Sequence, residues 1–403
     1  MRSADAEAVQ IIRARDAGGE PERLALKYKA MREGASAFFR GACHLYFRRL
    51  AQGPQPPAAP LAWICGDLHL NNFATLIGAG GRTVFVVNDF DECGLAPVTY
   101  DILRGASSVY AARKRLALDK EQARAHVAVL VEAFAAALQR VDAGEPPSPH
   151  KADTSSLAVA GARTLEARTR VVDGQRRLRV DGKYALPATP AQQRAVRRLI
   201  AADMAAVQLT VLDVARRVAG LGSLGRKRFS ILAQARGGDL QLLDLKEARA
   251  SAAAPFGGVA QPKWQSEALR VVAVESRCDP ALQGILTAVG APRAAMILRE
   301  LRPREARLDI ADLGGGEALR AHLTDLAQAA AQVSLRTAGW NGAAQLAALS
   351  AYGADRAWQV EIATLAVTLA RQNKDDWRVF CAAYDQGAFE PARPAGKLPR
   401  AKK

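Results

Sequence analysis

Gly66-Asp67-Leu68-His69-Leu70-Asn71-Asn72 is the stretch of this 403-residue sequence around which the rest is organised. The apolar segment before it, 61–65, has the length of a buried strand. After it the pattern predicts a hairpin over 73–88, whose turn is Gly78-Ala79-Gly80-Gly81. The hairpin ends at Asn88-Asp89-Phe90-Asp91-Glu92. We therefore expect it to return the chain so that Asp89 lies beside Asn72.

Three polar residues of this stretch are of the types that phosphoryl transfer uses. A carboxylate such as Asp67 orients the attacking group, while an amide and a second carboxylate, such as Asn72 and Asp89, hold Mg²⁺. A single Asp or Asn near a turn is more often a cap or a turn residue, but three at these offsets favour a site for Mg²⁺ and phosphate. Asp91 is a candidate for a further Mg²⁺ ligand. His69 is expected to organise the loop through hydrogen bonds, because no second His or Cys lies at ligand spacing.

A second informative stretch is Gly220-Leu221-Gly222-Ser223-Leu224-Gly225, which fits the pattern GxGxxG. Two predicted strands, 228–235 and 240–245, follow it and lead to Lys246. This succession predicts a phosphate-binding site. Backbone N–H groups of Gly220, Gly222, Ser223 and Gly225 would approach the phosphates, and Lys246 would add a positive charge. The alternative is an ordinary hairpin with a glycine turn and a surface lysine.

These motifs also resemble those of known families. Gly66-Asp67-Leu68-His69-x-x-Asn72 is similar to the catalytic loop of aminoglycoside and choline phosphotransferases, the small-molecule branch of the protein-kinase-like fold. At closer range the chain resembles a bacterial family catalogued as domain of unknown function 2252, over roughly residues 25–385. The segments that carry this second match are Phe38-Phe39-Arg40-Gly41, Gly66-Asp67-x-His69-x-x-Asn72-Phe73, Asn88-Asp89-Phe90-Asp91-Glu92 and Gly220-x-Gly222-Ser223-x-Gly225.

The kinase resemblance implies an α+β fold of two lobes that binds Mg²⁺-ATP between them. It assigns Asp67 as the catalytic base and Asp101 as the residue that ties down the catalytic loop. It also implies that a helix glutamate, Glu267 or Glu275, pairs with Lys246. In kinases the glycine loop and the lysine precede the catalytic loop, whereas here they follow it by about 150 residues. The resemblance therefore implies a circular permutation of the kinase-like fold, which is physically possible because a site is defined in space.

This interpretation divides the chain into five parts. They are a helical large-lobe segment with the catalytic and metal-binding loops (1–145), a connecting insertion and helix (146–209), a β-rich nucleotide-binding small lobe (210–312), a C-terminal helical part of the large lobe (313–390) and a disordered basic tail (391–403).

Several local patterns give further expectations. Residues 1–33 and 36–50 each read as a helix, a third helix runs from Pro190 to about residue 209, and a capping box starts another helix at Asp119. Asp181-Gly182 reads as the turn of a hairpin. Arg40, beside an apolar helix face, is either a helix-edge ion pair or a clamp for phosphate. His322 is expected at the surface.

Composition bounds the classes of function. The chain holds 56 Lys and Arg against 40 Asp and Glu, a net charge of +16, which suits nucleic-acid binding as well as the attraction of nucleotide phosphates. The basic residues are dispersed and no nucleic-acid-binding motif accompanies them, so nucleic acid remains the lesser alternative. No apolar run reaches 18 residues and no signal peptide is apparent, so no membrane partner is expected. Five scattered cysteines indicate a reducing cytoplasm.

The sequence therefore predicts an ATP-dependent phosphotransferase that uses ATP and Mg²⁺. Its acceptor would be a small molecule or a protein, which the sequence does not identify. Adenylyl transfer from ATP is one alternative, and a non-catalytic scaffold that binds nucleotide or nucleic acid is another. The oligomeric state is left open.

Overall fold

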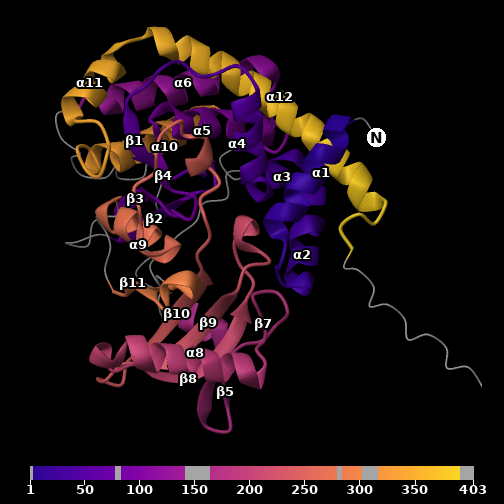
Figure 1. Ribbon diagram of the computed structural model, residues 1–403, viewed down its shortest axis with the longest axis vertical. Helices are drawn as coiled ribbons and strands as arrows, with labels where there is room; N and C mark the ends of the chain where they lie inside the picture. The colour runs from indigo at the N-terminus through magenta and orange to yellow at the C-terminus, as the bar shows by residue number, and fades with distance from the viewer. Residues whose placement is uncertain (1–2, 78–82, 141–163, 279–283, 302–315, 391–403) are drawn as a thin grey trace, which may run out of the picture.

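The chain folds into a helical part and a sheet part, stacked along the long axis of the molecule (Figure 1). The computed structural model describes residues 3–77, 83–140, 164–278, 284–301 and 316–390. Helices and strands both contribute, so the predicted α+β class is confirmed. The predicted glycine turn at 78–81 and the predicted basic tail at 391–403 lie outside the described residues.

The helical part is built from both ends of the chain (Figure 1). Its helices are α1 (Ser3–Asp16), α2 (Pro21–Arg32), α3 (Ala35–Gly41), α4 (Cys43–Gln52), α5 (Thr99–Ala112), α6 (Lys120–Leu138), α10 (Glu317–Arg336), α11 (Leu346–Ala354) and α12 (Ala357–Asp385). The long helix α12 packs on α5 and on α1, and α10 packs on α6. Elements more than 200 residues apart in sequence therefore share one core.

Helix α5 lies at the centre of this core. Ile102, Leu103 and Ala106 are fully buried, because apolar or small residues occur on nearly every face of the helix. The polar residues Asp101 and Arg104, on the same helix, are buried as well. A charged side chain is seldom buried without a partner, so these two residues point to the site that α5 supports.

Two small sheets hold the loops on which the site is built. Strand β1 (Leu61–Ile64) pairs with β4 (Gly94–Pro97), and β2 (Phe73–Ile77) pairs with β3 (Thr83–Val87), both antiparallel. The stretch 66–72 lies between β1 and β2, and the stretch 88–92 follows β3. The hairpin predicted over 73–88 is therefore present, and it brings these two polar stretches together.

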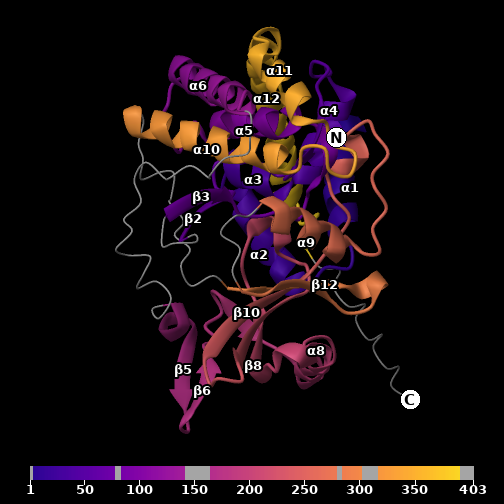
Figure 2. The ribbon, with the colours of Figure 1, turned by 90° about the vertical axis from the view of Figure 1, so that its left-hand side faces the viewer.

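The sheet part is a curled, antiparallel half-barrel of six strands. Its order is β11-β12-β10-β9-β8-β7, formed by β7 (Ala185–Pro187), β8 (Thr210–Arg217), β9 (Arg228–Gln234), β10 (Leu240–Glu247), β11 (Leu286–Val289) and β12 (Met296–Glu300). The helix α8 (Pro190–Asp203) packs Val196 and Ile200 on the sheet. The helix α9 (Glu267–Cys278) lies between the sheet and the helical part (Figure 2). A separate hairpin joins β5 (Thr169–Val172) to β6 (Gln175–Leu178).

Two helix predictions are wrong in their extent at the N-terminus. The described part of this segment, residues 3–33, forms two helices, because Gly18 adopts φ of +75° and ends α1. Residues 36–50 also form two helices, which meet at Ala42 with φ of −118° and ψ of 40°. Gly41 packs directly on Met31, and a Cβ at Gly41 would lie 2.6 Å from that side chain. The chain therefore turns where a glycine weakens the helix and a neighbour fills its place.

Three further predictions need correction. The helix from Pro190 ends at Asp203 rather than near 209. Asp181 forms a turn, its carboxylate accepting hydrogen bonds from the N–H groups of Lys183 and Tyr184, but the strands beside it pair elsewhere. His322 is buried, with its ring 5.3 Å from that of Phe85, because α10 packs on β3.

The capping box predicted at Asp119 is confirmed. The side chain of Asp119 accepts a hydrogen bond from the N–H of Gln122 and starts α6 as a capping box. Strand β7 joins the sheet although it precedes residue 210, so the sheet reaches beyond the predicted small lobe. Within the described residues, no helix combines the length and the apolar character needed to cross a membrane.

Candidate functional site

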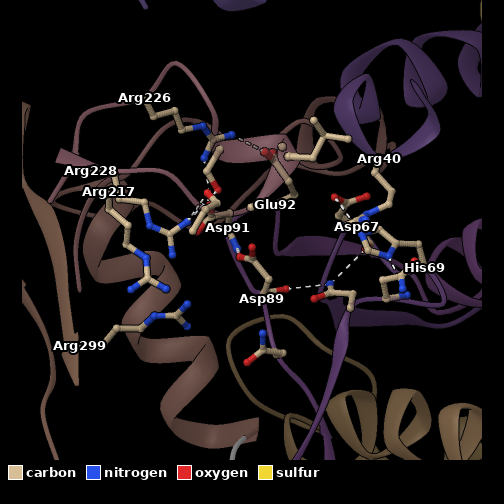
Figure 3. A pocket seen from close by; sticks show the side chains of 18 residues that line it. Arg40, Asp67, His69, Asp89, Asp91, Glu92, Arg217, Arg226, Arg228 and Arg299 are labelled. Atoms are coloured by element: carbon tan, nitrogen blue, oxygen red, sulfur yellow. Dashed lines mark hydrogen bonds and ion pairs between the residues drawn. The ribbon is translucent and has the colours of Figure 1, made fainter. Parts of the chain in front are cut away.

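A charged cavity lies where the sheet part meets the helical part (Figure 3). Most of its lining comes from three segments that are distant in sequence, namely 67–72, 88–92 and 217–228. Arg40 on α3 and Arg299 on β12 complete it. The predicted site residues that line this one cavity are Asp67, Asn72, Asp89, Asp91, Gly220, Gly222 and Ser223.

Asp101 fixes the loop that begins at Gly66. Its carboxylate accepts hydrogen bonds from the N–H of Cys65 at 2.7 Å and from the N–H of Gly66 at 3.0 Å. Gly66 has φ of +78°, and a Cβ there would lie 1.9 Å from the carbonyl oxygen of Glu92, so only glycine fits. The supporting role expected of Asp101 is therefore confirmed.

Asn72 connects the loop to the segment after β3. Its Nδ2 donates hydrogen bonds to the backbone carbonyls of Asp67 at 3.1 Å and Asp89 at 3.2 Å. The expectation that the hairpin brings Asp89 beside Asn72 is confirmed. Because the amide nitrogen is used in this way, Oδ1 remains as the atom for other partners, and it accepts no hydrogen bond from the described residues.

Asp67 is held by a buried arginine of α5. Arg104 donates through Nε to Oδ1 of Asp67 at 2.8 Å, and its Nη2 donates to the same oxygen. The guanidinium of Arg104 lies against the ring of Phe39, with Cζ 4.2 Å from the ring centroid. The side chain of Asp67 keeps 19% of its surface exposed toward the cavity. Its position is thus fixed from the core side while its other side stays accessible.

The environment makes Asp67 a better proton acceptor than an ordinary aspartate. Burial raises the pKa of Asp67 to about 6, the negative charges of Glu92 and Asp89 add to this rise, and Arg104 opposes it. A carboxyl group with a pKa near 6 is deprotonated at neutral pH and still takes up a proton readily.

His69 organises the loop, as predicted. Its Nδ1 accepts a hydrogen bond from the N–H of Asn71 at 3.1 Å, and its Nε2 lies 4.0 Å from Oδ2 of Asp67. Burial lowers the pKa of His69 far below its usual value, and the positive charges of Arg40 and Arg104 lower it further. The imidazole is therefore neutral at physiological pH.

Lys246 reaches the end of β3 from strand β10. Its Nζ lies 2.5 Å from Oδ2 of Asp91 and 3.4 Å from Oδ1 of Asp89, which is 157 positions away in the chain. The glutamates expected to pair with Lys246 make ion pairs with arginines. Glu267 pairs with Arg270 at 2.7 Å, and Glu275 lies 3.7 Å from Arg299.

Asp89 and Asp91 differ in their surroundings. The side chain of Asp89 is 40% exposed, whereas that of Asp91 is 10% exposed and its Oδ2 accepts hydrogen bonds from both Lys246 and Arg226. Burial acts to raise the pKa of Asp89, but the charges of Lys246 and Arg299 outweigh it and hold the pKa below its usual value. Burial and the charge of Asp89 raise the pKa of Asp91.

A magnesium ion would find oxygen ligands in this arrangement. The described residues contain no group of three His, Cys, Asp or Glu side chains arranged for a metal. Mg²⁺ does not require one, because it commonly binds through one or two carboxylates together with water and substrate phosphates. The accessible carboxylate of Asp89 and Oδ1 of Asn72 are donors of that kind. Asp91 fits less well, because two cations already share its Oδ2.

Glu92 joins three segments behind the cavity. Its carboxylate accepts hydrogen bonds from Arg226 at 2.7 Å, from Arg15 at 3.2 Å and from the N–H of Ala252 at 2.5 Å. Burial acts to raise the pKa of Glu92, but Arg226 and Arg15 outweigh it and lower the pKa to about 2. Because Arg226 also binds Asp91, it connects the glycine turn with the segment after β3.

The glycine turn lies between β8 and β9, with a short 3₁₀ segment at Leu221–Ser223. The N–H groups of Ser223 and Leu224 donate to the carbonyl of Gly220, and the N–H of Arg226 donates to that of Ser223. Of the four N–H groups expected to approach a phosphate, that of Ser223 is therefore used within the turn. Gly225, with φ of +95°, lies on the side of α2, where its carbonyl accepts a hydrogen bond from the N–H of Glu20.

An aspartate surrounded by three arginines lies on the sheet. Arg228 donates through Nε and Nη2 to the two oxygens of Asp244, at 2.8 and 2.5 Å. Arg217 and Arg299 approach the same carboxylate less closely, with Nε at 3.7 and 3.5 Å. The sequence analysis missed these residues. One signal was available, since Asp244 and Lys246 alternate with Leu243 and Leu245 and so mark one charged face of β10.

The fold and the site together define an α+β protein with a charged cavity between a helical part and a curled sheet. Residues 19–383 match the family DUF2252, described as uncharacterized protein conserved in bacteria, and the chain belongs to this family, as predicted. No curated protein matches the chain, and no solved structure does either.

Proposed function

We propose that the protein transfers a phosphorus-containing group from Mg²⁺-bound ATP to an acceptor, in the manner of protein-kinase-like proteins. The observation that carries this proposal is the convergence of Asp67, Asn72 and Asp89 on one cavity, where Lys246, 157 positions from Asp89, contacts Asp89 from the sheet. Residues that only capped helices or formed turns would not be expected to lie together at one site. Transfer of the γ-phosphoryl group is the first form of the proposal.

In this form each residue has a definite task. The acceptor hydroxyl or amine gives its proton to the carboxylate of Asp67, as its oxygen or nitrogen forms a bond to the γ-phosphorus. The bond from that phosphorus to the bridging oxygen breaks, and ADP leaves. Lys246 balances the phosphate charge, and Asn72 and Asp89 would hold the metal. When bound, Mg²⁺ supplies charge neutralisation for the phosphates.

The succession of elements in the sheet supports the comparison with kinases. The glycine turn follows β8, Lys246 lies on β10, the second strand after the turn, and α9 comes next. Kinases carry their glycine loop, the lysine of the third strand and the following helix in the same succession. Asp67 and Asp89 come earlier in the chain, so we include a circular permutation of the two lobes in the proposal.

Ligand-induced stabilisation tests the nucleotide site. ATP at about 100 times its Kd adds roughly 2.7 kcal/mol to the free energy of unfolding, which gives a readily measured rise in Tm. We expect this rise to depend on Mg²⁺ in the wild type and to be lost in Asp89→Ala. Asp239→Ala, at an exposed turn of the sheet, is the matched control and should respond as the wild type does. If millimolar ATP leaves the wild-type Tm unchanged with and without Mg²⁺, the proposal fails.

Transfer of the adenylyl group is a second candidate for the same site. The specific observation in its favour is the row of arginines on the sheet wall, which suits phosphate groups better than a base. Intact-mass analysis of the reaction products separates the two forms, because the acceptor gains either a phosphoryl or an adenylyl group.

A further inference from the structure

Three arginines surround one buried aspartate, Asp244, on the sheet wall of the cavity. Arg228 already engages both oxygens of Asp244 through short hydrogen bonds. Arg217 approaches that same carboxylate only to 3.7 Å, which is too far for a hydrogen bond, and Arg299 lies between Asp244 at 3.5 Å and Glu275 at 3.7 Å. Nε of Arg217 is buried and has no hydrogen-bond partner within the described residues.

The pKa of Arg217 reflects this crowding of positive charge. Burial, together with repulsion from Arg228 and Arg299, lowers the pKa of Arg217 to about 9, and the attraction of Asp244 offsets only part of this effect. A guanidinium is normally charged at every accessible pH, and an anion bound beside Arg217 would offset both its burial and this repulsion.

Arg217 and Arg299 are also accessible from the cavity. Their side chains are 16% and 19% exposed, and both line it together with Asp89. Figure 3 shows Arg217 and Arg299 on one side of Asp89, and Asp67 with His69 on the other. A single extended ligand could therefore touch the arginines, the region of Asp89 and the carboxylate of Asp67.

We infer that Arg217 and Arg299 form a subsite for the terminal phosphate groups of a polyphosphate ligand, so that the donor enters with its phosphate end toward the sheet. A guanidinium fork matches phosphate oxygens and forms charge-assisted hydrogen bonds with them. A purine on this wall would instead cover charged side chains without bringing an anion to Arg217. The inference rests on the proposed function and decides between its two forms.

With the phosphate end at the arginines, the α-phosphorus of ATP is the one nearest to Asp67. The acceptor oxygen or nitrogen forms a bond to that phosphorus and passes its proton to Asp67. The bond between the α-phosphorus and the oxygen that bridges it to the β-phosphorus breaks. Pyrophosphate leaves, and the arginines bind its charge. This orientation therefore selects adenylyl transfer.

The subsite is tested with a ligand that has no base. Tripolyphosphate and adenosine are titrated separately into the full-length protein at constant ionic strength, without Mg²⁺, and binding is measured by calorimetry. We expect tripolyphosphate to bind and to compete with ATP, and adenosine not to bind. The double variant Arg217→Gln, Arg299→Gln should bind tripolyphosphate at least about tenfold more weakly, since a hydrogen bond to a charged group contributes about 1.5–3 kcal/mol.

Matched variants separate the possible outcomes. Arg236→Gln, at the exposed β9–β10 turn, removes the same charge outside the cavity and should bind like the wild type. Arg217→Lys keeps the charge and loses the fork, and is the substitute if the double variant does not fold. Unchanged tripolyphosphate binding in the double variant, or tight binding of adenosine, overturns the subsite. If ATP still stabilises the wild type through Asp89 in that case, the proposed function stands alone.

Discussion

The orientation of the Asp67 side chain is fixed by its neighbours. It faces the cavity on one side and receives two hydrogen bonds from Arg104 on the other. Arg104 is itself fully buried among aromatic rings, so the pair is fixed in position by the core of the helical part. The proposed base is therefore oriented before any ligand arrives, which is how an active site avoids reorganisation during the reaction.

Breaking this pair should destabilise the protein far more than breaking a surface pair. Arg104→Met leaves the carboxylate of Asp67 without its cation, and we expect a loss of about 3–5 kcal/mol in the free energy of unfolding. Adding Asp67→Asn removes the stranded charge and should recover part of the loss. Urea unfolding of the two single variants and the double variant measures the coupling.

The exposed pair of Arg378 and Asp375 provides the control. Their side chains are 62% and 53% exposed, so Arg378→Met should cost no more than about 1 kcal/mol. Equal losses in Arg104→Met and Arg378→Met would show that burial of the Asp67 pair contributes nothing.

Sequence reasoning found the acidic and amide residues of the site and one of its arginines, Arg40, but missed the others. Asp67, Asn72 and Asp89 stand at informative offsets within one short stretch. Arg104, Arg217 and Arg299 stand in no motif, and a chain with 56 Lys and Arg offers no local sign of which ones turn inward. Their roles depend on which strands and helices become neighbours, and that is settled only by the complete fold.

Among the structural elements, the loop at 66–72 depends on one close approach of backbone to backbone. Gly66 lies against the carbonyl of Glu92, and Asp101 holds the N–H groups of Cys65 and Gly66 from α5. The loop is thus clamped between two segments, and any side chain at position 66 would force them apart.

A pair of glycine substitutions separates this steric clash from backbone strain. Gly66 and Gly174 have similar φ, +78° and +73°, but a Cβ at Gly174 meets nothing within 4 Å. We expect Gly174→Ala to lower the free energy of unfolding by about 1–2 kcal/mol through strain alone. Gly66→Ala should cost about 3 kcal/mol or more in addition, because the backbone of Glu92 must move. Chemical denaturation checks both, and equal costs would contradict the close approach.

The strands were predicted well where polar and apolar residues alternate. β9 and β10 lie within two residues of their expected bounds. β8 was missed, because a bulge between Val211 and Asp213 interrupts its alternation. The order of the sheet and its curl could not be predicted, since they depend on register between strands that no local pattern records.

At the scale of the whole molecule, the two parts are joined by buried charge. Arg226 binds Asp91 and Glu92, Arg15 also binds Glu92, and Lys246 reaches across from the sheet. This junction forms the floor of the cavity, so the geometry of the site and the attachment of the two parts depend on the same residues.

The junction should make stability sensitive to acid. The pKa of Glu92 is about 2, below its usual 4.5. The contribution of Glu92 to the free energy of unfolding is therefore complete above pH 4.5 and is lost as the pH falls toward 2. Arg226→Gln removes its main positive partner, and we expect a loss of about 2–4 kcal/mol at pH 7 and a shift of the acid-induced loss to higher pH. Urea unfolding between pH 2 and 7 measures both. Arg236→Gln is the control, and identical pH profiles for the two variants would contradict the assignment.

The helical part, built from both ends of the chain, also sets an order of events during synthesis. Trp377 on α12 donates a hydrogen bond to the carbonyl of Met31, 346 positions earlier, and their neighbours share one cluster of buried side chains. At 5–20 residues per second a ribosome needs roughly 20–70 s to cover that interval. The sheet, whose strands are consecutive in the chain, can form meanwhile. The apolar faces of the first helices therefore stay exposed until the last helix has been synthesised.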